Sequence, residues 1–378
     1  MYNVAFQIIT QLCIFLFFYV IYTILSLSYT ISPIRYCNNS KNYDTLTSIM
    51  FFLLLLMSVI YNNNGDYYTY RNWFLYGYGE TAKTDEWIEP IYYWIKFVIP
   101  PVFILFRFVI WGTGIFIYKK LCEKLGINIL LAYVLFGVFY IFAYSYARVS
   151  LGIMITSYAF VLLIKRESNS FFHYIKIILL FLLASLLHKS CLSLVFILLL
   201  SLLLKFNGTT LILLAILFIP ISSLLNSNLV TIFEYIGLSD IQSERYLKTN
   251  DDFIDKTSEI IFYVPILILL IVSIVKLYKN RKVIPIHIQR VVMGTITILY
   301  VASILTTLSL TATQIFFIRF SLMAFVLALI CCIYAIQNLK ISKVLLVILI
   351  FWCSLYYCYS ILVMVKYGAP QLLERFYL

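Results

Sequence analysis

Two ionisable positions interrupt an otherwise apolar stretch that runs from Ala143 to Lys205. The first is Arg148, and the second is the His188–Lys189 pair, which lies beyond a short polar connector. An ionisable residue within or at the rim of a membrane-spanning segment is energetically costly, so it predicts a function. A guanidinium group can hold two phosphate oxygens at once, and an imidazole can accept a proton near neutral pH. The stretch therefore predicts a site that binds an anion and moves a proton at the membrane.

Further cations are predicted to share this site. Arg148 and Arg319 each lie at the outer end of an apolar span, and Lys189 lies next to His188. The alternative is that these side chains extend to lipid headgroups, as many basic residues at helix ends do. We favour phosphate binding because three cations and one histidine share one face. Arg107, which lies within a span near a Pro pair, either joins the site or pairs locally.

Carboxylates and aromatic rings gather in a predicted outer loop at about residues 62–99. Asp66 and Glu89 each lie at the end of an apolar segment, where a charge predicts a functional role. Carboxylates accept hydrogen bonds from sugar hydroxyls, and flat rings stack on the apolar faces of pyranoses. For the Tyr and Trp residues of the loop, an aromatic belt at the membrane interface is the better interpretation. For the two carboxylates, a functional role and ordinary loop charge are equally open.

The composition restricts the elements that can hold these residues. Hydrophobic residues make up 63% of the 378 residues and charged residues 12%, proportions that no soluble globular domain matches. Repeated apolar runs predict an all-α, polytopic integral membrane protein. Residues 89–99, which are too few to cross and end at Pro100–Pro101, predict an interfacial or re-entrant helix. The expected transmembrane helices, about twelve, are 4–27, 44–61, 100–118, 127–147, 149–164, 174–188, 190–205, 209–225, 259–278, 291–310, 318–337 and 343–364.

Loop charges orient the predicted helices. One set of loops holds sixteen basic and three acidic residues, and the other side holds the remaining thirteen acidic residues. By the positive-inside rule the basic loops lie in the cytoplasm, which places both termini outside. The same rule explains the net charge of +12 without nucleic acid as a partner. The eight Cys form no CxxC or Cys/His cluster, so no metal site and no cofactor are expected.

The stretch from Ile177 to Leu204 tests this topology. As a single helix it would be about 42 Å long, against a hydrocarbon core of about 30 Å. It would also invert every later loop and place the basic run from Lys276 to Arg290 outside. Two short helices that turn at His188–Lys189–Ser190 avoid both conflicts, so we predict a hairpin there.

A second outer loop is predicted at about residues 226–258, within a single membrane domain that spans residues 1–378. Apolar residues at helical spacing open the loop and predict an amphipathic helix on the membrane surface. Ser239 followed by Gln242 resembles a capping box and predicts a second helix that carries Arg245 and Tyr246. A lid over a membrane-embedded substrate and a solvated helix without a role fit these patterns equally.

Six pieces of the sequence, in order, resemble the EpsG-like branch of the Wzy polysaccharide polymerases. They are Asp66-Tyr67-Tyr68-x-Tyr70, Glu89-Pro90 before a short helix, Arg148 after an aromatic-rich span, His188-x-Ser190 at a helical turn, Arg245-Tyr246 in the late outer loop, and Arg319. Their shared order covers nearly the whole chain. One departure follows Arg148, where the family commonly continues with Gln and small residues and this chain has Val149 and Ser150.

The resemblance implies a membrane glycosyltransferase with a GT-C-like helical architecture, at the outer face of a bacterial inner membrane. Such a polymerase transfers a growing glycan from undecaprenyl diphosphate to a hydroxyl group of another lipid-linked repeat unit. The cations expected to stabilise the leaving diphosphate without a metal are Arg148, Arg319, Lys189 and Arg245. The expected catalytic base is His188, with Asp66 and Glu89 as alternatives. The residues expected to contact sugar are Tyr67, Tyr70 and Tyr246.

Two other functions use a similar site. A transporter or flippase of lipid-linked oligosaccharides also needs cations and aromatic rings in a membrane cavity, but the features here gather at one face and no inverted repeat is evident. An O-antigen ligase uses the same donor and differs only in its acceptor. The expected partners are the lipid-linked oligosaccharide and membrane lipids, together with a chain-length regulator and a flippase of the same pathway. O-antigen, capsule and exopolysaccharide products are not distinguished by the sequence.

Reporter fusions test the predicted orientation. A reporter fused after Lys282 should report the cytoplasm and one fused after Asn250 the exterior, because of the sixteen-to-three basic excess on the loops assigned to the inside. The reverse pattern would contradict both the membrane topology and the site built on it.

Overall fold

The computed structural model describes residues 2–32, 40–60, 71, 73–75, 90–139, 147–166, 170–227, 253–307 and 313–367. All regular elements within these ranges are α-helices, which confirms the predicted all-α class. Each predicted span overlaps one helix, and the short helix predicted before Pro100 is α5. The helices are α1 (Tyr2–Ile31), α3 (Ser40–Ile60), α5 (Pro90–Val98), α6 (Phe103–Leu125), α7 (Ile129–Phe139), α8 (Ala147–Lys165), α9 (Phe171–Leu187), α10 (Ser190–Ser201), α11 (Gly208–Ser227), α14 (Phe253–Lys279), α15 (Ile286–Thr307), α16 (Thr313–Asn338) and α17 (Lys343–Tyr367).

Three segments in the described part of the chain are long and apolar enough to cross a bilayer, by length and composition. They are Thr10–Ile31, Lys41–Ile60 and Ile286–Ile304. Shorter apolar helices, α7 to α11 among them, accompany these segments. The protein is therefore a helical membrane protein. The count of twelve crossings, the single-domain organisation and the limits of the two outer loops stay predictions.

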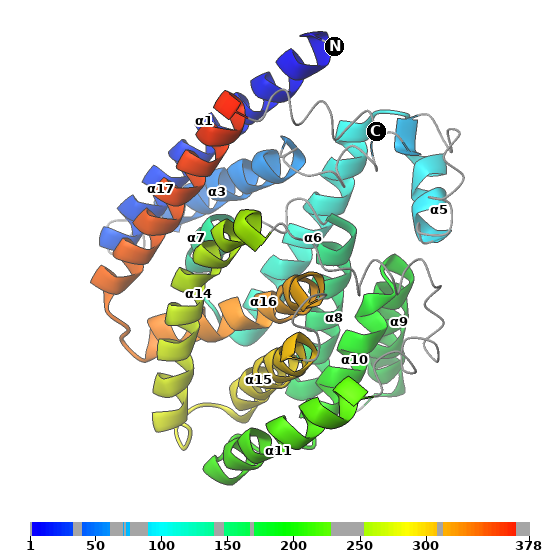
Figure 1. Cartoon of the computed structure of the whole chain (residues 1–378), viewed down its shortest axis with the longest axis vertical. Helices are drawn as coiled ribbons and strands as arrows, with labels where there is room; N and C mark the ends of the chain where they lie inside the picture. The colour runs from blue at the N-terminus through cyan, green and yellow to red at the C-terminus, as the bar shows by residue number, and fades with distance from the viewer. Residues whose placement is uncertain are drawn as a thin grey trace. The chain divides into compact units, whose positions relative to one another are not determined.

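The helices form two compact units. In the first, which comprises residues 1–192 and 336–378, α1 packs against α3 and α17, and α6 packs against α3 and α8 (Figure 1). In the second, residues 193–335, α11 packs against α15. There Arg290 of α15 donates hydrogen bonds to the carbonyl oxygens of Leu202 and Leu204. Arg107, Arg148 and His188 all lie in the first unit.

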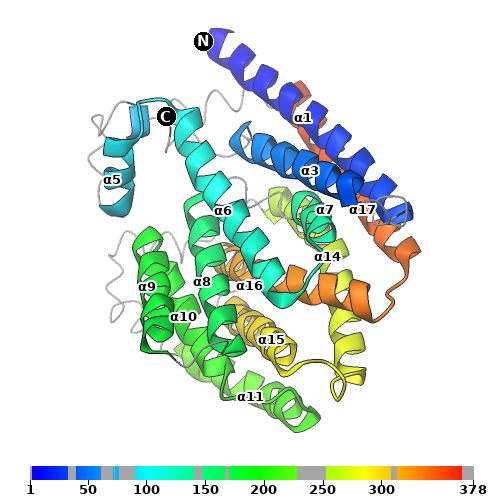
Figure 2. The ribbon, with the colours of Figure 1, turned by 180° about the vertical axis from the view of Figure 1, so that it is seen from behind.

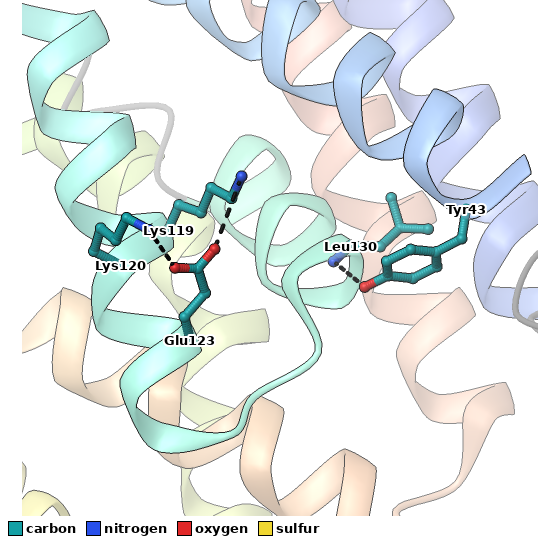
Figure 3. Close-up of polar contacts among 5 residues, drawn as sticks. All are labelled: Tyr43, Lys119, Lys120, Glu123 and Leu130. Carbon is teal, nitrogen blue, oxygen red and sulfur yellow. Dashed lines mark hydrogen bonds and ion pairs between the residues drawn. The ribbon is translucent and has the colours of Figure 1, made fainter. Parts of the chain in front are cut away.

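Polar contacts lie near the end of α6 and the start of α7, on the side predicted to face the cytoplasm. Figure 3 shows Tyr43 of α3, whose hydroxyl oxygen accepts a hydrogen bond from the N–H of Leu130 at the start of α7 (3.5 Å). It also shows Glu123 of α6 between Lys119 and Lys120, at 3.8 and 2.8 Å. Exposed ion pairs of this kind add little stability. The contact of Tyr43 links α3 to the start of α7, whereas the ion pairs of Glu123 stay within α6.

Small residues set the register of an antiparallel hairpin made by α8 and α9 (Figure 2). A Cβ added at Gly152 would lie 2.5 Å from the sulfur of Cys191 and 3.4 Å from the carbonyl oxygen of Ala184. Farther along the pair, Ala159 packs with Ile177. The missing side chain at Gly152 allows the two backbones to approach closely at this end of the hairpin.

The predicted turn at His188 is confirmed. Helix α9 ends at Leu187 and α10 begins at Ser190. The backbone N–H of His188 donates to the carbonyl oxygen of Ala184 (3.0 Å), and its φ of −160° and ψ of 125° are those of extended chain. The carbonyl oxygen of His188 then accepts from the N–H of Cys191 (2.9 Å). Backbone hydrogen bonds on both sides therefore hold the turn.

Replacing Gly152 with Ala should destabilise the packing of α8 against α9 and the start of α10, because the new methyl group needs space that the Cys191 sulfur occupies. Overpacking of this kind typically costs about 1–3 kcal/mol, so the thermal unfolding midpoint of the detergent-purified protein should fall. Adding Cys191→Ala should restore most of the loss. Gly112→Ala is the control, since an added Cβ there meets only Leu55, at 3.9 Å. A double variant as unstable as the single one would contradict this packing.

Candidate functional site

The register of the hairpin brings position 148 level with His188. Gly152 of α8 meets Ala184 of α9. Arg148 lies four residues before Gly152 on α8. His188 lies four residues after Ala184, just past the end of α9. Because four residues make about one turn, position 148 lies on the same face of α8 as Gly152, the face packed against α9. The two residues that the sequence singled out are therefore neighbours in position across the hairpin.

Helix α6 brings a third ionisable residue, Arg107, to the level of position 148 and His188. It runs in the same direction as α8, since Gly114 lies against Met154 and, farther along both helices, the Lys165 ammonium donates to the Lys124 carbonyl oxygen (2.5 Å). Arg107 lies about two turns before Gly114 on the same face of α6, which places it beside the first residues of α8. We call Arg107, Arg148 and residues 188–190 the candidate site.

Arg107 is a buried cation at the end of a neighbouring helix. Only 1% of the residue is exposed, and its Nη2 donates a hydrogen bond of 2.5 Å to the carbonyl oxygen of Ser58 in the last turn of α3. A cation there also interacts favourably with the partial negative charge of the helix C-terminus. The sequence left open whether Arg107 pairs locally or joins the site. The structure shows the local contact and places Arg107 at the level of the site as well.

His188 lies half-buried at the turn, and Ser190 contacts its ring in two ways. The Nδ1 atom lies 2.5 Å from the Ser190 hydroxyl oxygen, and it accepts a hydrogen bond from the Ser190 backbone N–H (3.2 Å). Lys189, the residue between them, is exposed. The imidazole is thus held through Nδ1, and the chemistry open to the ring depends on the protonation of Nε2.

Buried aromatic rings cover the start of α6 beside Arg107. Ring centroids of neighbouring pairs lie 4.8–6.4 Å apart. The rings belong to Trp73, Phe74, Tyr92, Phe103 and Phe106. These rings and Arg107 are all buried, so the start of α6 lies in surroundings of low polarity, where electrostatic interactions are stronger than in water.

The cluster corrects one prediction for the first outer loop. Trp73 is only 7% exposed and packs inside the protein, so an interfacial belt is the wrong interpretation for this residue. Lys96 of α5 donates to the Trp73 carbonyl oxygen (2.9 Å) and lies over its indole ring. Partial burial lowers the pKa of the Lys96 ammonium. Trp94 on the same helix is 73% exposed, which fits a membrane interface.

Several predicted site residues lie outside the described part of the chain. These are Asp66, Tyr67, Tyr70, Glu89, Arg245 and Tyr246. Arg319 lies in the first half of α16, in the second unit, so its proximity to the candidate site stays a prediction. In the described ranges, no three His, Cys, Asp or Glu side chains gather as a metal ligand set.

The arrangement suits an anion beside a proton-transfer group. Two arginine positions and an imidazole share one level at the ends of α6, α8 and α9, next to a buried aromatic cluster. Comparison with known families then assigns the chain. The profile of the EpsG family matches residues 44–370, which include all the described residues of the candidate site. The chain belongs to the EpsG family.

Membership in the EpsG family supports, in general terms, a polysaccharide polymerase of the membrane with glycosyltransferase-like activity. The resemblance that six short motifs suggested is thereby confirmed at the level of the family. No curated protein and no solved structure matched the chain.

Cross-linking tests the geometry of the candidate site. In a background without native cysteines, Arg148→Cys with His188→Cys should react with a reagent that spans about 10 Å, the usual distance between packed helices. The control pair is Arg148→Cys with Lys176→Cys, because Lys176 lies about 18 Å farther along α9. Cross-linking of the control pair instead would contradict the register of the hairpin.

Proposed function

We propose that this protein is a polysaccharide polymerase. It transfers a glycan from undecaprenyl diphosphate to a hydroxyl group of another lipid-linked repeat unit, at the outer face of a bacterial inner membrane. The observation that supports this most is the common level of Arg148 and His188 across the α8–α9 hairpin, in a chain of the EpsG family. This common level of the two positions supports a role for Arg148 in phosphate binding and for His188 in proton transfer.

Arginines are suited to the leaving group of this reaction. As the bond between the anomeric carbon and the diphosphate oxygen breaks, the oxygen keeps the electron pair and negative charge grows on the diphosphate. Fixed guanidinium groups in a site shielded from water stabilise such charge strongly. We assign this role to Arg148 and Arg319, with Lys189 and Arg245 as further contacts. The buried aromatic cluster around Phe106 supports shielding on the Arg107 side.

His188 is proposed to be the general base. Its Nε2 accepts the proton of the acceptor hydroxyl while that oxygen forms a bond with the anomeric carbon. Ser190 contacts the ring at Nδ1 and backbone hydrogen bonds fix the turn, so the position of the ring is set. Asp66 and Glu89 remain the alternative bases, and Tyr67, Tyr70 and Tyr246 the proposed sugar contacts.

The two rival functions predict different products. An O-antigen ligase would transfer the glycan to an acceptor that is not a lipid-linked repeat, and a flippase would form no new glycosidic bond. The polymerase is favoured because the EpsG family supports polymerisation in general. Its proposed partners are the lipid-linked oligosaccharide, membrane lipids, a chain-length regulator and a flippase.

Arginine variants test the diphosphate site. Arg148→Lys keeps the charge but loses the bidentate fork, so polymer length should collapse while the protein still inserts in the membrane. Arg319→Ala should act in the same way. Lys279→Ala, at the end of α14 on the side predicted to be cytoplasmic, is the control and should leave polymer length unchanged. Normal polymer from both arginine variants would show that these side chains extend to lipid headgroups instead.

A purified assay with one lipid-linked repeat as both donor and acceptor tests the base. His188→Gln should still bind the substrate, but its turnover should fall by about 10²- to 10⁴-fold, the usual contribution of general-base catalysis. His173→Gln, at the opposite end of α9, is the matched control. Undiminished turnover of the His188 variant would make His188 a structural residue and would move the test to Asp66 and Glu89.

A further inference from the structure

Two turns of the second unit pack against each other, one between α10 and α11 and one between α14 and α15. Arg290, near the start of α15, donates hydrogen bonds to the carbonyl oxygens of Leu202 and Leu204. The rings of Phe206 and Tyr278 meet edge to face, with their centroids 5.7 Å apart. The two turns therefore form one continuous surface, on the side of the protein that is predicted to face the cytoplasm.

Further contacts fix the turn between α14 and α15. The side-chain amide of Gln289 donates to the carbonyl oxygens of Arg281 (2.8 Å) and Ile284 (3.1 Å). The Arg281 guanidinium lies over the Tyr278 ring, 4.3 Å from its centroid, and donates to the Tyr278 carbonyl oxygen (3.0 Å). A guanidinium has five N–H donors, so these contacts orient the group and still leave donors for an anion.

Two exposed lysines share this surface with Arg281. Lys205 belongs to the first turn and Lys282 to the second. We call Lys205, Arg281 and Lys282 the basic platform. In the described residues of the second unit, the only Asp and Glu residues lie near the start of α14, at the end of that helix far from the platform.

A second group of cations, in the first unit, shows the contrast. Lys119 and Lys120 of α6 lie on the same predicted side, and both pair with Glu123, at 3.8 and 2.8 Å. Their charge is partly neutralised within the helix. The basic platform has no such carboxylate among the described residues of its unit, so its charge favours an anion from outside the protein.

Exposed apolar side chains flank the platform and indicate which anion it suits. Leu203, Val283 and Ile286 are 79%, 86% and 63% exposed, and Ile286 begins a segment that is long and apolar enough to cross a bilayer. Cations beside apolar side chains match the interface of a bilayer, where headgroup phosphates meet acyl chains. A water-soluble acidic protein or free phosphate would match the charge and leave the apolar side chains in water.

We propose that the basic platform binds the phosphate headgroups of anionic phospholipids in the cytoplasmic leaflet, while their acyl chains cover the flanking apolar side chains. The held guanidinium of Arg281 contacts the phosphate oxygens, and the two lysines add charge on either side of it. The platform lies in the second unit, whereas Arg148 and His188 lie in the first. The inference does not depend on the proposed polymerase reaction.

Native mass spectrometry of the full-length protein in detergent, titrated with phosphatidylglycerol, measures this binding. The protein should bind phosphatidylglycerol more tightly than phosphatidylcholine with the same acyl chains. Lys205→Gln with Lys282→Gln should weaken the binding of phosphatidylglycerol by roughly 30-fold, since each basic residue near an anionic lipid surface contributes about fivefold. Lys205→Arg with Lys282→Arg keeps both charges and should bind as the unmodified protein does.

The matched control is Lys119→Gln with Lys120→Gln, which removes the same charge from the same predicted side, beside Glu123, and should leave the affinity unchanged. An equal loss in the control would show that net charge alone matters and would overturn the platform. Unchanged affinity in the Lys205 and Lys282 double Gln variant would also overturn it and would favour an acidic protein as the occupant. Displacement of the lipid by millimolar glycerol 3-phosphate would show that soluble phosphates bind there instead.

Discussion

The close approach of α8 and α9 at Gly152 is the constraint on which the candidate site depends. A side chain at this position would collide with the sulfur of Cys191 at the start of α10 and would crowd the Ala184 carbonyl oxygen of α9, so the absence of a side chain at residue 152 lets α8 pack closely here. The contact fixes the register of the hairpin, and the register fixes which residues share a level. One turn farther on, it places Arg148 opposite His188, and the turn that holds His188 is closed by backbone hydrogen bonds. The geometry of the candidate site at the end of the hairpin therefore depends on packing that lies outside the site.

Burial of charge is the second constraint. Arg107 is enclosed by protein in a helix of membrane-like composition, where an unsatisfied cation would be very costly. Its hydrogen bond to the Ser58 carbonyl oxygen uses a helix end, a place where backbone acceptors are available. The buried rings around Phe106 exclude water from the same region. The Arg107 guanidinium therefore links α6 to the end of α3 and also adds positive charge to this buried region.

Much of the fold was predictable because apolar length and charge are direct signals in membrane proteins. The run from Ile177 to Leu204 was too long for one crossing and as one helix would have inverted the later loops, and these two arguments gave the turn at His188, which α9 and α10 confirm. The sequence also indicated that Arg148 and His188 share one face of the membrane. It gave no sign of the Gly152 contact, since a glycine in an apolar run does not reveal which helix it meets. The contacts of Arg107 and Trp73 were equally hidden, because both depend on distant segments that come together only in the folded chain.

The most direct test of the proposed polymerase measures bond formation and lipid release together. The unmodified protein is placed in liposomes with a single lipid-linked repeat unit, and products are followed by chain length, by free undecaprenyl diphosphate and by movement of the repeat across the bilayer. A polymerase predicts a ladder of longer glycans, with one undecaprenyl diphosphate released for each new linkage. Movement of the repeat across the bilayer with no new linkage would contradict the account.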